Sequence, residues 1–377
     1  MQTFIAKVII LMSLLLGIST NQLFQAVAED KSSQWQPLPQ EGIKRIAFGS
    51  CAKQWQYQPI WQAVIDVQPD LFLFLGDAIY ADTDGKTAWD VSEKQLRGEW
   101  NRLADKPEFQ AVKAKIPFMA VWDNHDYGTH NGGAEFPLKE QSKTAFLDFF
   151  GEPINSEKRK REGIYDAQIF GNEGQRVQII LLDTRYFKGN FVKDTRTPEE
   201  KAKLGIVGKY LANEDPNVTL LGEAQWQWLE EQLKKPAEVR LIASSTQIVA
   251  DQKGMDEWGN YPHERLKLFD LIQRTGAKGV ILLSGNVHFA EISVWNEGNY
   301  PLYDFTSSGM THIEPKYANV ANPYRVNHPY IDLNFGLVEI NWHNSLGTLV
   351  TLKVITAKGE TAFAHQIFLE KLTSLNL

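Results

Sequence analysis

The stretch AVWDNHDYGTHNGG, from Ala120 to Gly133, gathers side chains that bind metals and transfer protons. It contains two histidines, two asparagines and two aspartates directly after the apolar run IPFMAVW, and it ends in a glycine pair. Imidazole, amide and carboxylate groups coordinate cations, and an imidazole also exchanges protons near neutral pH. A single loop of this composition is usually only a polar connection, so its interpretation depends on what the rest of the chain supplies.

Chemically similar groups follow the other apolar runs. Together they comprise a thiol, a phenol, carboxylates, amides and imidazoles, which is the donor inventory of a metal centre, and an arginine suited to a bidentate oxyanion. Each group alone has a structural explanation, such as packing for a cysteine on a buried strand. Their recurrence after successive runs is harder to explain by packing alone. The residues are Cys51; Asp77 and Tyr80; Asp123, Asn124, His125 and Asp126; Asp183 and Arg185; and Asn286, His288 and Glu291.

The elements that must position these groups are predicted to be buried strands. RIAFGSC, PDLFLFLGDAIY, KAKIPFMAVWDNHD, VQIILLDTRYF, VRLIASSTQIV and GVILLSGNVHFAE are apolar runs that end in polar residues, and helix-like stretches such as GEAQWQWLEEQLKK lie between them. This order predicts an α/β sheet, in which functional groups collect at the carboxyl ends of the strands. Residues 336–377 alternate apolar and polar positions around turn signals, which predicts antiparallel strands that close the sheet edge.

The N-terminal residues predict export. Residues 1–28 contain a lysine, an apolar run and the small-residue pattern AVA, which are the three parts of a secretory signal peptide. No Arg-Arg pair precedes the run, so we expect a Sec-type signal and a periplasmic or secreted protein. The run is short for a membrane span, and an uncleaved anchor is the alternative. Residues 29–43 form a polar leader, and residues 44–377 form the predicted domain.

Composition excludes some partners. The formal net charge of −7 argues against a nucleic-acid-binding surface, which needs excess positive charge. Nothing after the signal is long and apolar enough to predict a transmembrane helix. Cys51 is the single cysteine and cannot form an intramolecular disulfide, so in an exported protein we expect it to be buried or bound to a metal.

The motifs resemble those of a known family. A cysteine after the first strand, then GDAIY, WDNHDYG, LDTRYF, QWQWLEEQL and SGNVHFAE, in this order from about Arg45 to about Gly309, are similar to the alkaline phosphatase D (PhoD) family of calcineurin-like metallophosphoesterases. The resemblance implies a four-layer α/β/β/α sandwich with ferric iron (Fe3+) and calcium (Ca2+) at the strand ends, although another divalent metal is an alternative. It also implies hydrolysis of phosphate monoesters and diesters by a metal-activated water, with a small molecule, lipid or wall polymer as the substrate.

Within this resemblance, thiolate and phenolate ligands favour a high-valent iron, and neutral or anionic oxygens favour calcium. His125 is placed to protonate the leaving oxygen, and Arg185 to hold a non-bridging phosphate oxygen. The predicted iron ligands are Cys51, Asp77, Tyr80 and His288, with Asp77 bridging both ions. The predicted calcium ligands are Asn124 and, less directly, Asp123 and Asn286.

Amides replace carboxylates at three positions that tend to be acidic in the family pattern: Asn124, Asn131 and Asn286. An amide oxygen binds calcium without contributing charge, so calcium affinity should fall. His130 offers a nitrogen donor that would favour a different metal. The alternative function is therefore a non-catalytic relative that binds a metal or an anionic ligand. A carbohydrate-binding protein that uses its tryptophans is a weaker alternative, because QWQWLEEQL has the spacing of a helix core face.

Overall fold

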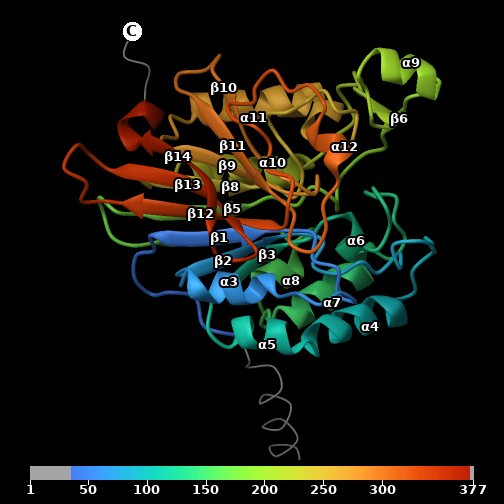
Figure 1. Ribbon diagram of the computed structural model, residues 1–377, viewed down its shortest axis with the longest axis horizontal. Helices are drawn as coiled ribbons and strands as arrows, with labels where there is room; N and C mark the ends of the chain where they lie inside the picture. Colours follow the sequence, from blue (N-terminus) through green and yellow to red (C-terminus); the bar gives the residue numbers. More distant parts are fainter. Residues whose placement is uncertain (1–34, 374–377) are drawn as a thin grey trace, which may run out of the picture.

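The computed structural model describes residues 35–373, and the predicted signal peptide lies outside them. Two six-stranded mixed sheets pack face to face, with helices on both outer sides (Figure 1). This is the α/β/β/α sandwich that the family resemblance implied. Within residues 35–373, no helix is both long and apolar enough to cross a membrane.

The first sheet has the strand order β14-β13-β12-β1-β2-β3. Its three parallel strands are β1 (Arg45–Gly49), β2 (Leu71–Leu75) and β3 (Phe118–Val121). The sequence LFLFL of β2 is buried at every position, as expected for a strand covered on both faces. The C-terminal strands β12 (Asn334–Asn341), β13 (Leu349–Thr356) and β14 (Thr361–Phe368) extend this sheet in antiparallel order, which confirms the prediction for the tail.

The second sheet has the order β10-β11-β9-β8-β5-β4. Parallel strands β5 (Val177–Leu181), β8 (Val239–Ala243), β9 (Val280–Ser284) and β11 (Leu302–Ser307) form its centre. The antiparallel strands β4 (Asp166–Phe170) and β10 (Ala290–Trp295) form its edges. The apolar runs are thus divided between two sheets, a division that periodicity does not reveal because most of these runs are buried on both faces.

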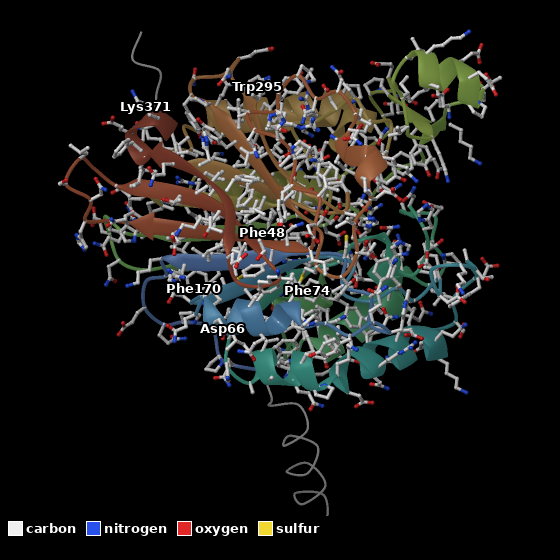
Figure 2. The ribbon with its side chains drawn as sticks, viewed as in Figure 1. Phe48, Asp66, Phe74, Phe170, Trp295 and Lys371 are labelled. Atoms are coloured by element: carbon white, nitrogen blue, oxygen red, sulfur yellow. The ribbon has the colours of Figure 1, made fainter. Side chains whose placement is uncertain are left out.

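The two sheets share one core. The ring of Phe48 on β1 meets the ring of Phe305 on β11 edge to face, with centroids 4.9 Å apart. Figure 2 shows Phe48 at this boundary between the sheets. Both rings are fully buried, so this contact fixes the distance between the sheets and the relative height of their strand ends.

Helices cover the outer faces. The first sheet is covered by α3 (Ile60–Asp66), α4 (Glu93–Ala104), α5 (Pro107–Lys113) and α7 (Lys139–Phe149), and the second by α10 (Glu223–Leu233) and α11 (Pro262–Arg274) (Figure 1). Trp226 and Leu229 of α10 are buried, as the spacing of QWQWLEEQL predicts. The shorter elements are α6 (Asn124–Tyr127), α8 (Glu157–Lys160), β6 (Val192–Lys193), α9 (Pro198–Lys203), β7 (Tyr210–Leu211), α12 (Pro315–Ala318) and the 3-10 turns Trp258–Asn260 and Leu369–Leu372.

Candidate metal centre

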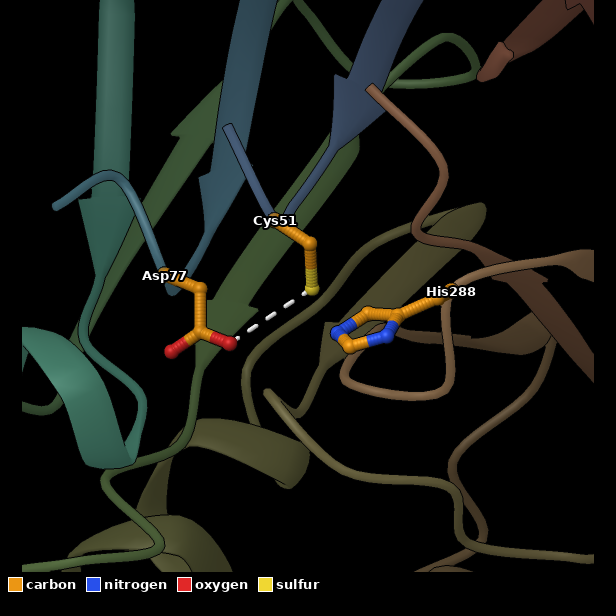
Figure 3. A group of neighbouring side chains, drawn as sticks. All are labelled: Cys51, Asp77 and His288. Carbon is orange, nitrogen blue, oxygen red and sulfur yellow. Dashed lines mark hydrogen bonds between the residues drawn. The ribbon is translucent and has the colours of Figure 1, made fainter. Parts of the chain in front are cut away.

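Three predicted ligands from both sheets meet at the carboxyl ends of their strands. Cys51 follows β1, Asp77 follows β2 and His288 follows β9, and one donor atom of each lies within 4.8 Å of the others. Figure 3 shows the thiol and a carboxylate oxygen facing the same ring nitrogen of His288. The Cys51 thiol donates to Oδ2 of Asp77 across 3.5 Å. A buried thiol, a buried carboxylate and a partly buried imidazole that converge in this way are a fitting donor set for a transition metal.

The backbone around these donors is strained. Cys51, Asp77, Asn286 and His288 have φ values of 65°, 52°, 70° and 62°, although none is a glycine. Left-handed conformations of such residues cost about 1–3 kcal/mol each and persist where the surrounding structure enforces them. Here they turn the chain sharply after each strand, so that the donor side chains face one another.

Two glycines allow the strand ends to approach. A Cβ on Gly285 would lie 2.4 Å from Ser50 Oγ, so β9 and β1 could not come this close with any larger residue. A Cβ on Gly76, whose φ is +93°, would lie 2.4 Å from the Cβ of Asp123. The Gly-Asp and Ser-Gly-Asn sequences at the strand ends therefore have a steric reason.

Asp126 links the loop after β2 to the loop after β3 through hydrogen bonds. Its carboxylate accepts hydrogen bonds from the backbone N–H groups of Asp77 (2.5 Å), Ile79 (2.9 Å) and Asp123 (2.9 Å). The second aspartate of the WDNHD motif is thus a structural acceptor that holds the loop after β2 against the loop after β3. On the other sheet, Ser308 Oγ accepts the N–H of His288 across 2.7 Å.

Tyr80 completes the predicted iron side. Its side chain is buried, and its hydroxyl lies 3.3 Å from Nε2 of His312, a residue absent from the sequence-based predictions. Burial raises the pKa of both the Cys51 thiol and the Tyr80 phenol well above their ordinary values. Burial also lowers the pKa of His288 to about 3, which leaves its imidazole neutral and its lone pair available to a metal.

The donor chemistry fits a cation. Burial also raises the pKa of Asp77, so three desolvated acids lie side by side. Their anionic forms repel one another and lack hydration, and a bound cation of high charge would offset both penalties. The residues therefore fit the metal that the family resemblance implies.

His125 is placed beside the donors and held by a carboxylate. Its Nδ1 lies 2.6 Å from Oδ1 of Asp82, and its ring lies against the ring of Tyr80 with centroids 4.3 Å apart. Burial alone would lower the pKa of His125, but the neighbouring Asp77 and Asp82 carboxylates raise it. The structure thus places an imidazole that is oriented by Asp82, and whose pKa is raised, next to the donor cluster.

A cavity of about 120 Å³ opens beside the donors. This volume is smaller than the ~300–1,000 Å³ typical of sites for drug-sized ligands, and it suits a compact group. His125 and His288 line it together with the predicted calcium ligands Asn124 and Asn286. Its other described lining residues are His130, Asn131, Val207, Gly208, Lys209, Tyr210, Met255, Asp256 and Tyr317.

Arg185 lies between two buried carboxylates. Its guanidinium is completely buried and forms ion pairs with Asp123 and, across 2.5 Å, with Asp256. Nε of Arg185 donates to Oδ1 of Asp123 across 2.7 Å, and the same oxygen accepts from Ser245 Oγ across 2.8 Å. Arg185 is absent from the described residues that line the cavity. Asp123 accepts from Nε and Nη2 of Arg185, whereas Nη1 faces Asp256 without a hydrogen bond, so the predicted role of Arg185 in holding a phosphate oxygen stays a prediction.

Other residues of the inventory also serve the scaffold. Asp183 accepts from the indole of Trp122 across 2.7 Å and from several backbone N–H groups, and Glu291 pairs with Arg325 and Lys253. Asp123 is almost fully buried beside Arg185, and its ligand role stays a prediction.

Sequence reasoning missed Asp82, Asp256 and His312. His312 follows β11, which ends in small residues (TSSGMTH) like the other strands that carry donors. This signal was available in the sequence. Asp82 and Asp256 lie in irregular segments, where no periodicity marks them.

Comparison with known proteins identifies the family and the fold. The PhoD-like phosphatase family model matches residues 46–314. The alkaline phosphatase D of Bacillus subtilis (strain 168) is 23% identical over 307 residues, which cover 72% of this chain and 50% of that protein. The chain thus spans about half the length of this curated relative. A solved structure of PhoD superposes with a TM-score of 0.66 at 18% identity, covering 88% of this chain and 70% of that one, and it shares the fold.

Proposed function

The chain belongs to the PhoD-like phosphatase family, and we propose that it is an exported, metal-dependent phosphoesterase that hydrolyses phosphate monoesters or diesters. One observation carries the proposal: Cys51, Asp77 and His288, from three strand ends in two sheets, present donor atoms within 4.8 Å of one another beside a small cavity. Export rests on the signal-like residues 1–28.

The side chains divide between two cation positions. Cys51, Asp77, Tyr80 and His288 would hold ferric iron, because thiolate, phenolate and imidazole ligands suit a transition metal. Asn124 and Asn286, with Asp123 as a further candidate, offer oxygens that suit calcium. Bound cations at such a site polarise phosphoryl oxygens and lower the pKa of water.

His125 would donate the proton that the leaving oxygen needs. It lines the cavity, Asp82 fixes its ring through Nδ1, and the nearby carboxylates raise its pKa. The bond to Asp82 directs the other ring nitrogen away from that carboxylate, which suits a general acid. Asp82 is thereby a positioning residue.

The substrate would be a phosphate ester whose phosphoryl group fits the cavity, carried by a small molecule, a lipid or a wall polymer. Lys209 lies on the wall of the cavity and adds a positive charge there. The volume of the cavity restricts the size of the group that reacts, but it does not restrict the length of the molecule that carries the phosphate ester.

A second candidate function is supported by Asn124 and Asn286. Both line the cavity as neutral amides, so the calcium position has fewer negative charges than a carboxylate-lined site. A family member of this kind would bind a metal or an anionic ligand without turnover.

The test combines metal analysis with two substrates. Elemental analysis of the purified protein should find iron and calcium, its visible spectrum should show charge-transfer absorption, and it should hydrolyse a model monoester or diester. Cys51→Ala should lose the absorption and the iron, whereas Tyr303→Phe, a half-buried tyrosine on β11 away from the donors, should keep both. Iron without hydrolysis of either ester would favour the second candidate, and a colourless protein that hydrolyses esters would refute the ligand set.

A further inference from the structure

We propose that His312 is an additional ligand of the ion held by Tyr80 and His288, so that two imidazoles bind one metal. The inference rests on the metal centre of the proposed function and deepens it. It concerns a residue that the strand-end motifs of the sequence did not predict.

The distances support a shared ion. Nε2 of His312 lies 3.2 Å from Nε2 of His288 and 3.3 Å from the Tyr80 hydroxyl. Two nitrogens bound about 2.1 Å from one ion at adjacent positions are separated by about 2.9–3.4 Å. The nitrogen of His288 that faces His312 also faces Cys51 and Asp77 in Figure 3. His312 therefore reaches the donor cluster from the side of Tyr80 and His288.

The hydrogen bonds of Thr311 select the tautomer that a ligand needs. The Thr311 hydroxyl donates its one proton to the carbonyl of Cys51 across 3.0 Å and accepts the N–H of Lys53 across 2.9 Å. Its remaining lone pair then faces Nδ1 of His312 at 3.2 Å, which is the arrangement in which Nδ1 carries the proton and donates it to Thr311. The lone pair of His312 is then on Nε2, the atom that faces Tyr80 and His288.

This arrangement matches the support that metal-binding histidines usually have. A ligating imidazole almost always donates its other N–H to a fixed acceptor, which sets the ring orientation. Thr311 provides that acceptor and is itself tied to the backbone of Cys51, another donor residue. The orientation of His312 is therefore coupled to the loop that carries the thiol.

The consequence is a more nitrogen-rich and more crowded site. Cys51, Asp77, Tyr80 and His288 would be joined by a second imidazole, that of His312, on the side of Tyr80 and His288. With two imidazoles, this position should bind transition metals, which favour nitrogen ligands, more strongly than magnesium or calcium.

The test counts imidazoles on ferric iron loaded into the full mature chain. Pulsed EPR should detect nitrogen couplings from two imidazoles in the unaltered protein and from one in His312→Ala. Loss of His312 should weaken iron binding by at least the ~10–100-fold that typically follows loss of a ligand's hydrogen-bond partner. Imidazole added in solution should restore part of the lost affinity. His365→Ala, a half-buried histidine that contacts Tyr303, is the control and should change neither measurement.

The outcomes separate this inference from the proposed function. A protein that binds iron with charge-transfer absorption but shows one imidazole both before and after His312→Ala would overturn the inference and leave the proposed function standing. A protein that takes up no iron would refute the proposed metal centre itself. If His312→Ala fails to fold, the imidazole count of the unaltered protein still decides, and Thr311→Val, which keeps the imidazole, should weaken iron binding without removing the second nitrogen coupling.

Discussion

Replacing Arg185 with methionine tests whether this residue stabilises the site or binds phosphate. Methionine keeps the length and apolar stem of the side chain and removes the charge. In the structure, Arg185 is fully buried between Asp123 and Asp256, whose exposed fractions are 1% and 6%. The substitution would leave both carboxylates buried without their common cation.

The expected cost follows from this burial. Removing one partner of a buried ion pair typically destabilises a protein by about 3–5 kcal/mol, because the remaining charge has neither water nor a counter-ion. Two carboxylates depend on Arg185, so we expect a value at the upper end of that range. Arg176→Met is the matched control, because Arg176 pairs with Glu238 at a distance of 2.6 Å while both side chains are 23% exposed. Pairs nearer to solvent are worth about 0–1 kcal/mol.

The assay is chemical unfolding of both variants without added metal. Asp256→Asn in the Arg185→Met background removes one of the two buried carboxylates that lack a counter-ion, and it should recover part of the lost stability. If the two residues did not interact, the losses of stability from the two substitutions would instead add. The reasoning is refuted if Arg185→Met is as stable as Arg176→Met while KM for a phosphate ester and the inhibition constant for inorganic phosphate both rise. That result would restore the sequence-based role of Arg185 as a phosphate ligand.

Three further predictions concern the donors and the proton. His125→Ala should lower kcat by about 10²–10⁴-fold with metal content unchanged, and Asp82→Asn should lower kcat by a smaller factor; loss of metal from either variant would reassign that residue to metal binding. Burial raises the pKa of the Cys51 thiol and of the Tyr80 phenol, so iron binding near pH 7 should release about two protons and iron affinity should rise with pH. Tyr80→Phe should reduce the number of released protons by one, as measured by calorimetry in buffers of different ionisation enthalpy. Asn124→Asp combined with Asn286→Asp should bind calcium more tightly and hydrolyse phosphate esters faster, and a slower double variant would show that the amides are suited to a working site.

The local pattern of apolar and polar residues determined most of the strands of this protein. Apolar runs such as LFLFL must be buried strands, and the alternation after residue 336 requires antiparallel strands. Parallel strands point the same way, so the residues that follow them collect at one edge without further information. This rule places Cys51 beside Asp77 in the first sheet, whereas their meeting with His288 of the second sheet was implied by the family resemblance and depends on how the two sheets stack.

Tertiary structure alone decided the partners of the buried charges. The carboxylates that surround Arg185 come from loops 62 and 71 residues away in the chain, and the acceptor that orients His125 lies 43 residues before it. Such pairings depend on how two sheets stack and where irregular loops end, and neither leaves a periodic trace in the sequence. The same holds for His312, whose ring is aimed at His288 only because β11 lies beside β9 and Thr311 is bound to the loop of Cys51.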